Sequence, residues 1–147
     1  MNRVKSILTL NRQMKLLIVE AFIFLAFARV IKCLPFSKTS KYLGERNKES
    51  SITNYEANLD TLKNISSAIH VASKYAPWET MCLVRAIASM KMLERRGIDS
   101  TLYMGTSRNN VKELTAHAWL RSGKYYVTGA NERHRFTITC TFAKRLG

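Results

Sequence analysis

The longest apolar stretch of the chain, LLIVEAFIFLAFARVIKCL, occupies residues 16–34. Pro35 follows it directly and cannot continue a helix, so we expect a helix over roughly residues 11–33. Apolar side chains lie nearly all round this helix. Such a helix is buried in a protein core or docked against a partner.

The same stretch is about as long as a membrane span, but its charges argue against that interpretation. Glu20, Arg29 and Lys32 each cost a few kcal/mol at the centre of a bilayer, and less near its surfaces. A signal peptide is also a poor match, because Pro35-Phe36 stands where a small-residue cleavage site would be needed. We therefore favour a helix of a soluble protein and keep membrane attachment as the alternative.

Helical and then alternating patterns divide the rest of the chain. Residues 36–51 are polar and predict a connector. Apolar residues at helical spacing predict helices over residues 55–74 and 81–96, the second with Thr80 as N-cap and Gly97 just past its end. After Gly97 the period changes to two, which predicts strands over residues 100–105, 116–121, 124–128 and 135–142.

The order of these elements, helices first and an antiparallel sheet last, predicts an α+β fold. Residues 1–50 form the apolar helix and connector, and residues 51–147 form the remaining domain. A turn at Ser122-Gly123 is expected to join two of the strands. In the last strand Phe136, Ile138, Cys140 and Phe142 share one face, so Cys140 is expected in the core.

The chain is strongly basic, with 24 Lys and Arg against 10 Asp and Glu and a formal charge of +14. Residues 1–50 and residues 51–147 each contribute +7, and no run of five or more like charges occurs. An even spread of this kind argues against a nucleic-acid arm or stripe. It leaves acidic peptides or proteins as the expected partners.

Cys33, Cys82 and Cys140 are far apart and form no C-x-x-C pair. Their odd number and wide spacing indicate neither a disulfide framework nor a metal site. Free thiols of this kind are typical of a reducing cytoplasm, which is the compartment we expect. The sequence indicates no cofactor.

Cys82 falls in the first turn of the helix predicted over residues 81–96. Unsatisfied N–H groups and the positive end of the helix dipole favour a thiolate there. His117, in the strand AHAWLR, supplies the other half of a thiolate–imidazolium pair. A buried structural cysteine and a structural strand histidine are the plainer alternatives, and position alone does not decide between them.

The segments PWETMCLVRAIASMKMLERRGI, TLYMG and AHAWLRSGKYYVTG resemble the transglutaminase-like cysteine peptidases of lasso-peptide biosynthesis. The N-terminal segment EAFIFLAFARVIKCLPFSKTSKYLG resembles the apolar helix and following segment of that family. The resemblance covers most of the chain, and the length suits the stand-alone form that lacks a fused leader-recognition domain.

This resemblance implies a transglutaminase-like or papain-like peptidase core and a leader peptidase. Cys82 becomes the nucleophile and His117 the general base and acid. The implied partners are a leader–core precursor peptide, a small separate leader-recognition protein and an ATP-dependent lasso cyclase. Nucleic acid is not an expected partner, and membrane contact is the less favoured one.

The family completes its triad with an Asp after the HAW motif, and here the last Asp is Asp99, before His117. Counting back across a Ser122-Gly123 turn pairs His117 with Thr128, which makes Thr128 the candidate for orienting the imidazole. Asn131 or Glu132 are the alternatives if the loop is longer. An acyltransferase with the same thioester chemistry and a non-enzymatic basic adaptor remain alternative functions.

Overall fold

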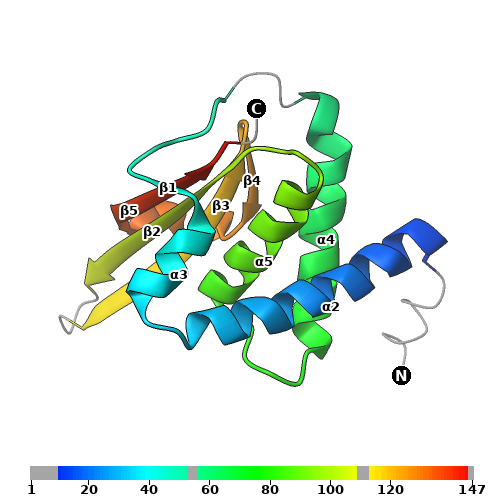
Figure 1. Cartoon of the computed structure of the whole chain (residues 1–147), viewed down its shortest axis with the longest axis horizontal. Coiled ribbons are helices and arrows are strands. Elements are labelled where there is room, and N and C mark those ends of the chain that lie inside the picture. Colours follow the sequence, from blue (N-terminus) through cyan, green and yellow to red (C-terminus); the bar gives the residue numbers. More distant parts are fainter. Residues whose placement is uncertain (1–9, 53–55, 109–112, 146–147) are drawn as a thin grey trace.

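The computed structural model describes residues 10–52, 56–108 and 113–145. Its strands form one antiparallel sheet of five strands in the order β1-β5-β2-β3-β4. The helices gather on one side of this sheet (Figure 1), where α5 contacts β2, β3 and β4 and α4 contacts β4. The bounds of these elements are β1 Glu45–Arg46, β2 Ser100–Arg108, β3 Leu114–Ser122, β4 Tyr125–Thr128, β5 Thr137–Lys144, α4 Leu59–Tyr75 and α5 Cys82–Arg95.

The apolar N-terminal stretch forms helix α2, Arg12–Lys32, which confirms the predicted helix. Asn11 caps it, because its Oδ1 accepts a hydrogen bond from the Met14 backbone N–H at 2.8 Å. The helix packs against α4 and α5 through one face. The buried residues of that face are Leu17, Ile18, Ala21, Leu25, Ala28 and Ile31.

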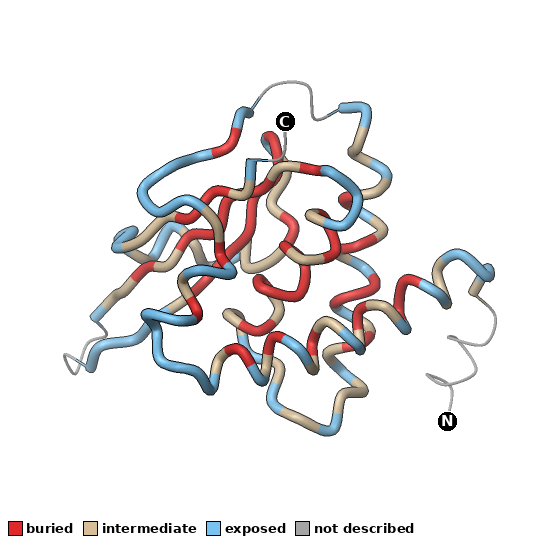
Figure 2. The backbone as a smooth tube through the Cα atoms, in the orientation of Figure 1, coloured by how far each residue is buried: buried red, intermediate tan, exposed pale blue. Residues whose placement is uncertain are grey.

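Helix α5 lies at the centre of the core, between the sheet and α2 (Figures 1 and 2). Gly97 lies just past its end with φ +70°, and the Ile98 N–H donates to Leu93 O at 3.0 Å, as predicted for this glycine. The predicted N-cap is wrong. Met81 occupies that position without a side-chain cap, and the Thr80 hydroxyl donates instead to Ser73 O.

The segment predicted as a polar connector contains two short elements, so that prediction is wrong in part. Helix α3, Phe36–Leu43, buries Thr39 and Leu43 on one side, and strand β1 pairs with β5. The Thr39 hydroxyl donates to Ile31 O at 2.9 Å, which ties α3 to the end of α2. Because only Thr39 and Leu43 are buried, the apolar pattern of this segment is too weak to predict a helix. A 3₁₀ helix, η1 (Glu56–Asn58), precedes α4.

The predicted strands are found near their predicted positions, but β2 and β3 are longer than predicted and β5 begins and ends two residues later. The register of β2 with β5 shifts between Met104 and Gly105. Because this irregularity breaks the alternation, Phe142 is fully buried whereas Ile138 is 52% exposed, so the prediction that Ile138 shares the face of Phe142 is wrong. Cys140 packs against the core but is only half-buried, so the prediction of a core residue holds only in part.

The hairpin between β3 and β4 turns one residue later than predicted. Ser122 pairs with Tyr125, and a shift of register further along then pairs Leu120 with Thr128. The predicted pairing of His117 with Thr128 is therefore wrong. The chain continues into a second 3₁₀ helix, η2 (Ala130–Arg135), after Gly129.

The fold is thus α+β, with an N-terminal helix and a cysteine at the start of a helix packed on a small antiparallel sheet, as predicted. Among the helices of the described residues, none combines the length and the apolar character that a bilayer span requires. The division into residues 1–50 and 51–147 stays a prediction.

Candidate active site

Cys82 is the first residue of α5 and is half-buried against the helical core. At this position the N–H groups of the first helical turn have no partner within the helix and point out of its end. They are therefore placed to donate to an oxygen bound beside the Cys82 sulfur.

The loop that leads into α5 is held by α2. Trp78 packs edge-on against Phe22, with 6.4 Å between the ring centroids. Next to it, Lys32 Nζ lies 2.7 Å from Glu79 Oε1 in an ion pair. These two contacts fix the approach to Cys82, so the N-terminal helix positions the start of α5.

His117 lies on β3, and its Nε2 is 3.0 Å from the backbone oxygen of Gly129. A carbonyl oxygen can only accept a hydrogen bond, so Nε2 carries the hydrogen in this contact. In the neutral ring Nδ1 is then the nitrogen with a free lone pair. The hydrogen bond thus selects Nδ1 as the atom that can accept a proton.

Aromatic packing fixes the plane of the His117 ring. Its centroid lies 5.7 Å from that of Trp119 and 5.0 Å from that of Phe136. Gly105 is opposite His117 in the register of β2 and β3, and a Cβ there would lie 3.0 Å from the Trp119 ring. Because Gly105 has no side chain, Trp119 can lie over it and beside the imidazole.

Gly129 is the residue that brings the carbonyl to His117. It adopts φ +71°, a conformation that a residue with a Cβ adopts only with strain. A Cβ at this position would also lie 2.7 Å from Ala118 O and 3.1 Å from His117 Nε2. Glycine is therefore required both by the backbone conformation and by the closeness of the imidazole.

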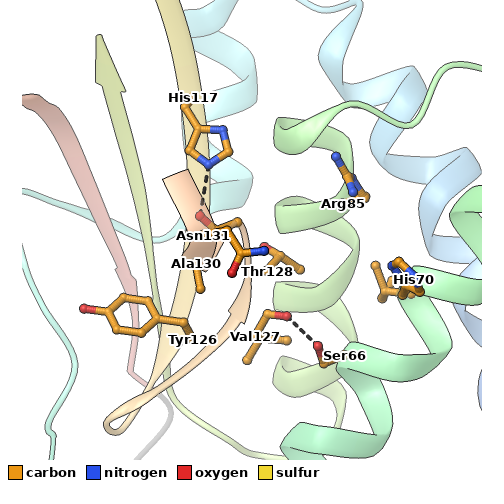
Figure 3. A pocket seen from close by; sticks show the side chains of 11 residues that line it. Ser66, His70, Arg85, His117, Tyr126, Val127, Thr128, Ala130 and Asn131 are labelled. Carbon is orange, nitrogen blue, oxygen red and sulfur yellow. Dashed lines mark hydrogen bonds between the residues drawn. The ribbon is translucent and has the colours of Figure 1, made fainter. Parts of the chain in front are cut away.

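A cavity of about 490 Å³ opens beside His117, between α4, α5 and the β3–β4 hairpin (Figure 3). The Ser66 hydroxyl closes one part of it by donating to Val127 O at 2.7 Å. The residues that line the cavity are Ser66, Ile69, His70, Arg85, His117, Tyr126, Val127, Thr128, Gly129, Ala130 and Asn131.

Cys82 is not among the residues that line this cavity, and its sulfur makes no hydrogen bond to the His117 ring. Arg85 lies one helical turn after Cys82 and lines the same cavity as His117. Hydrogen bonds between catalytic groups are often long without substrate and shorten in the complex. The absence of a hydrogen bond between Cys82 and His117 is therefore compatible with a catalytic dyad whose hydrogen bond forms when substrate binds.

Of the candidates for a third member, Thr128 and Asn131 line the cavity. The Thr128 hydroxyl is buried and has no hydrogen-bond partner among the described residues. The contact to His117 comes instead from the backbone oxygen of Gly129, a group that no side-chain motif could have indicated. The side chain of Glu132 lies outside the described residues.

Arg85 was not identified from the sequence, although its spacing of three residues from Cys82 places both on one face of a helix. Cys33, Cys82 and Cys140 are free thiols. In the described part of the chain no group of three or more His, Cys, Asp or Glu residues could hold a metal ion.

A cysteine at the start of a central helix and a histidine on a neighbouring strand of an antiparallel sheet are typical of the transglutaminase-like fold. A family model described as the Transglutaminase-like superfamily matches residues 21–141. The chain belongs to this superfamily, which includes cysteine peptidases and acyltransferases. Comparisons with curated proteins and with solved structures gave no significant match.

Proposed function

We propose that this protein is a cysteine peptidase that removes the leader from a ribosomally made lasso precursor peptide, with Cys82 as nucleophile and His117 as general base and acid. The observation that carries the proposal is the orientation of His117. Its Nε2 is engaged by Gly129 O, its Nδ1 is left to accept a proton, and it faces a cavity shared with the helix that Cys82 begins.

The reaction begins when Nδ1 of His117 takes the proton of the Cys82 thiol and the sulfur attacks the carbonyl carbon at the leader–core junction. N–H groups at the start of α5 stabilise the oxyanion that forms. The imidazolium then gives its proton to the leaving amine of the core, and the leader remains as a thioester on Cys82. Water, deprotonated by His117, hydrolyses the thioester and restores the thiol.

The backbone oxygen of Gly129 takes the orienting place that an Asp occupies in a Cys-His-Asp triad. Its partial negative charge stabilises the imidazolium, although less than a full carboxylate charge would. We therefore assign Thr128 no orienting role, because its hydroxyl makes no hydrogen bond to His117.

The lasso assignment is supported by the sequence segments around Cys82 and His117 and by the LPF…LG segment that follows the apolar helix. A separate recognition protein would hold the leader, and an ATP-dependent cyclase would join the freed amine to an Asp or Glu side chain. The formal charge of +14 favours acidic surfaces on these partners. Their affinities should then fall as salt rises, and unchanged affinity from low to physiological salt would contradict this role of the charge.

The proposal is tested by incubating the protein with a leader–core peptide and its recognition partner and measuring product masses. Peptidase activity gives a leader with a free C-terminal carboxyl group and a core with a free amine, whose masses together exceed that of the precursor by one water molecule. An acyltransferase, the second activity known in this superfamily, gives a leader joined to an added amine such as cadaverine. If the precursor stays intact in every mixture, the proposed function is wrong.

A further inference from the structure

Two buried polar atoms in the cavity beside His117 have no hydrogen-bond partner among the described residues. They are Nε of Arg85, on α5, and Oγ1 of Thr128, at the end of β4 (Figure 3). Buried polar groups in folded proteins are nearly always hydrogen-bonded, so two orphans in one cavity call for an explanation. A ligand that accepts hydrogen bonds would satisfy both.

The charge of Arg85 points to the kind of ligand. Its guanidinium forms no ion pair with any described residue, and no Asp or Glu is among the described residues that line the cavity. The buried Arg121 shows how this protein treats a structural arginine: it donates to Gly123 O, Ser50 O and the Tyr103 hydroxyl at 2.6 to 3.0 Å. Arg85 has no such partners, so an anion is the complementary ligand.

The position of Arg85 relates this ligand to the reaction. Cys82 and Arg85 are three residues apart on α5, so their side chains lie on one face of the helix, with about 5–6 Å between Cβ atoms. A group bound by Arg85 therefore lies close to the atoms that react with Cys82. His117 borders the same space.

We infer that Arg85 and Thr128 form a subsite for a carboxylate of the peptide substrate, borne by an Asp or Glu close to the bond that is cut; this inference rests on the proposed function. The guanidinium binds the carboxylate side-on through Nε and one Nη, and the Thr128 hydroxyl donates a further hydrogen bond. The bound carboxylate also offsets the positive charge of Arg85 when His117 becomes an imidazolium.

The subsite is tested without a known substrate by alkylating Cys82. In both iodoacetate and iodoacetamide the thiolate displaces iodide and forms a carbon–sulfur bond, but only iodoacetate carries a carboxylate. The rates at Cys82, measured by mass spectrometry of its peptide, give a ratio of the two reagents. We expect Arg85→Gln to lower the iodoacetate-to-iodoacetamide ratio about tenfold and Thr128→Val to lower it severalfold, whereas Arg108→Gln, on the exposed end of β2, leaves it unchanged.

A second measurement avoids variants. Acetate added to the unmodified protein should slow the reaction of Cys82 with iodoacetate and leave its reaction with iodoacetamide unchanged. A ratio that is the same in Arg85→Gln and in the unmodified protein, together with no protection by acetate, overturns the subsite. A Cys82 that reacts with iodoacetamide no faster than the exposed Cys33 contradicts the proposed nucleophile instead.

A separate surface supports a second inference. Helix α2 exposes a row of apolar side chains at spacings of three and four residues, opposite the face that packs on α4 and α5. The row is Leu16 at 60% exposed, Val19 at 56%, Ile23 at 62%, Phe27 at 37% and Val30 at 64%. A contiguous exposed apolar face of this length marks an interaction surface.

The charges around this row are basic. The acidic residue of the described segment 10–43 is Glu20, and its carboxylate is held by Arg95 and Arg96 of the same molecule. Besides Lys32, which pairs with Glu79, the basic residues of the segment are Arg12, Lys15, Arg29, Lys38 and Lys41. An apolar helix face flanked by Lys and Arg is typical of helices that lie in the surface of an anionic bilayer.

We propose that the exposed face of α2 binds an anionic lipid surface, with the helix parallel to the membrane. A single convex helix fits a flat bilayer, and its flanking cations reach the phosphate groups. A second copy of the chain is a poor occupant, because pairing this face would bring two molecules of charge +14 together.

Cosedimentation with vesicles tests this surface. We expect binding to vesicles of mixed phosphatidylglycerol and phosphatidylcholine, weaker binding at high salt and little binding to pure phosphatidylcholine. Ile23→Ser should weaken binding severalfold, whereas Ile52→Ser, at a position 52% exposed outside α2, should not. Failure to bind anionic vesicles, or equal binding by both variants, overturns the proposal. It is also overturned if the protein binds no vesicles but binds an acidic protein, and Ile23→Ser loses that binding.

Discussion

His117 owes its orientation to glycines as much as to hydrogen bonding. Gly129 presents its backbone oxygen to Nε2 from a left-handed conformation, and Gly105 leaves room for Trp119 beside the imidazole. The ring is thereby fixed on one edge by a hydrogen bond and on its faces by aromatic packing. Substitution of either glycine should therefore displace the His117 ring more than it disturbs the rest of the fold.

Gly129→Ala tests this at the residue scale. The left-handed conformation costs the new side chain about 1 to 2 kcal/mol, and its Cβ would also meet Nε2 of His117 at 3.1 Å. Gly97→Ala is the matched control, because φ is also positive there and nothing lies within 4 Å of the added Cβ. We expect the larger loss in the free energy of unfolding in Gly129→Ala, because its Cβ also lies 2.7 Å from Ala118 O. Activity per folded molecule should fall only in Gly129→Ala, and equal activity in both variants would contradict the role of Gly129.

At the scale of elements, α2 connects the N-terminal part of the chain to the start of α5. Its buried face packs on α4 and α5, Phe22 supports Trp78, and Lys32 pairs with Glu79 in the loop before Cys82. At the C-terminal end of α5, Arg96 forms an ion pair with Glu20 of α2. The helix thus holds α5 at both ends, which makes it part of the scaffold of the site.

Phe22→Ala measures this support. Removal of the ring leaves Trp78 without its edge-on partner, and we expect a loss of about 2 kcal/mol in the free energy of unfolding. Alkylation of Cys82 should also change in rate, because the loop before it loosens. Ile23→Ala, on the exposed face of the same helix, provides the control and should change neither quantity. Identical behaviour of the two variants would count against a scaffold role for α2.

The contact between Glu20 and α5 predicts a dependence on pH. The hydrogen bond from Arg96 lowers the pKa of Glu20 below its ordinary value of 4.5. The carboxylate therefore stabilises the folded state above that pH, and this contribution is lost as the pH falls through the lowered pKa. Glu20→Gln should reduce the free energy of unfolding by up to about 1 kcal/mol at neutral pH, with a smaller difference in acid. A difference that does not shrink below pH 4.5 would contradict this account.

At the scale of the whole molecule, periodicity predicted the main helices, four of the strands and the α+β class, because each long element buries one face. It missed α3, which buries only Thr39 and Leu43. It also misplaced the β3–β4 register, because the turn comes one residue later than predicted and a bulge follows it. Residue types with a known chemistry indicated Cys82 and His117. They could not indicate the Gly129 carbonyl, since a backbone oxygen carries no sequence signal.

The central claim is that the thiol of Cys82 performs the cleavage. It is tested most directly by the masses of the products when a leader–core precursor and its recognition protein are incubated with three forms of the chain. The unmodified protein and a Cys33→Ser, Cys140→Ser double variant should both release leader and core. Cys82→Ala should reduce the rate at least about a thousandfold. Cleavage by a folded Cys82→Ala protein at the unmodified rate would contradict the account.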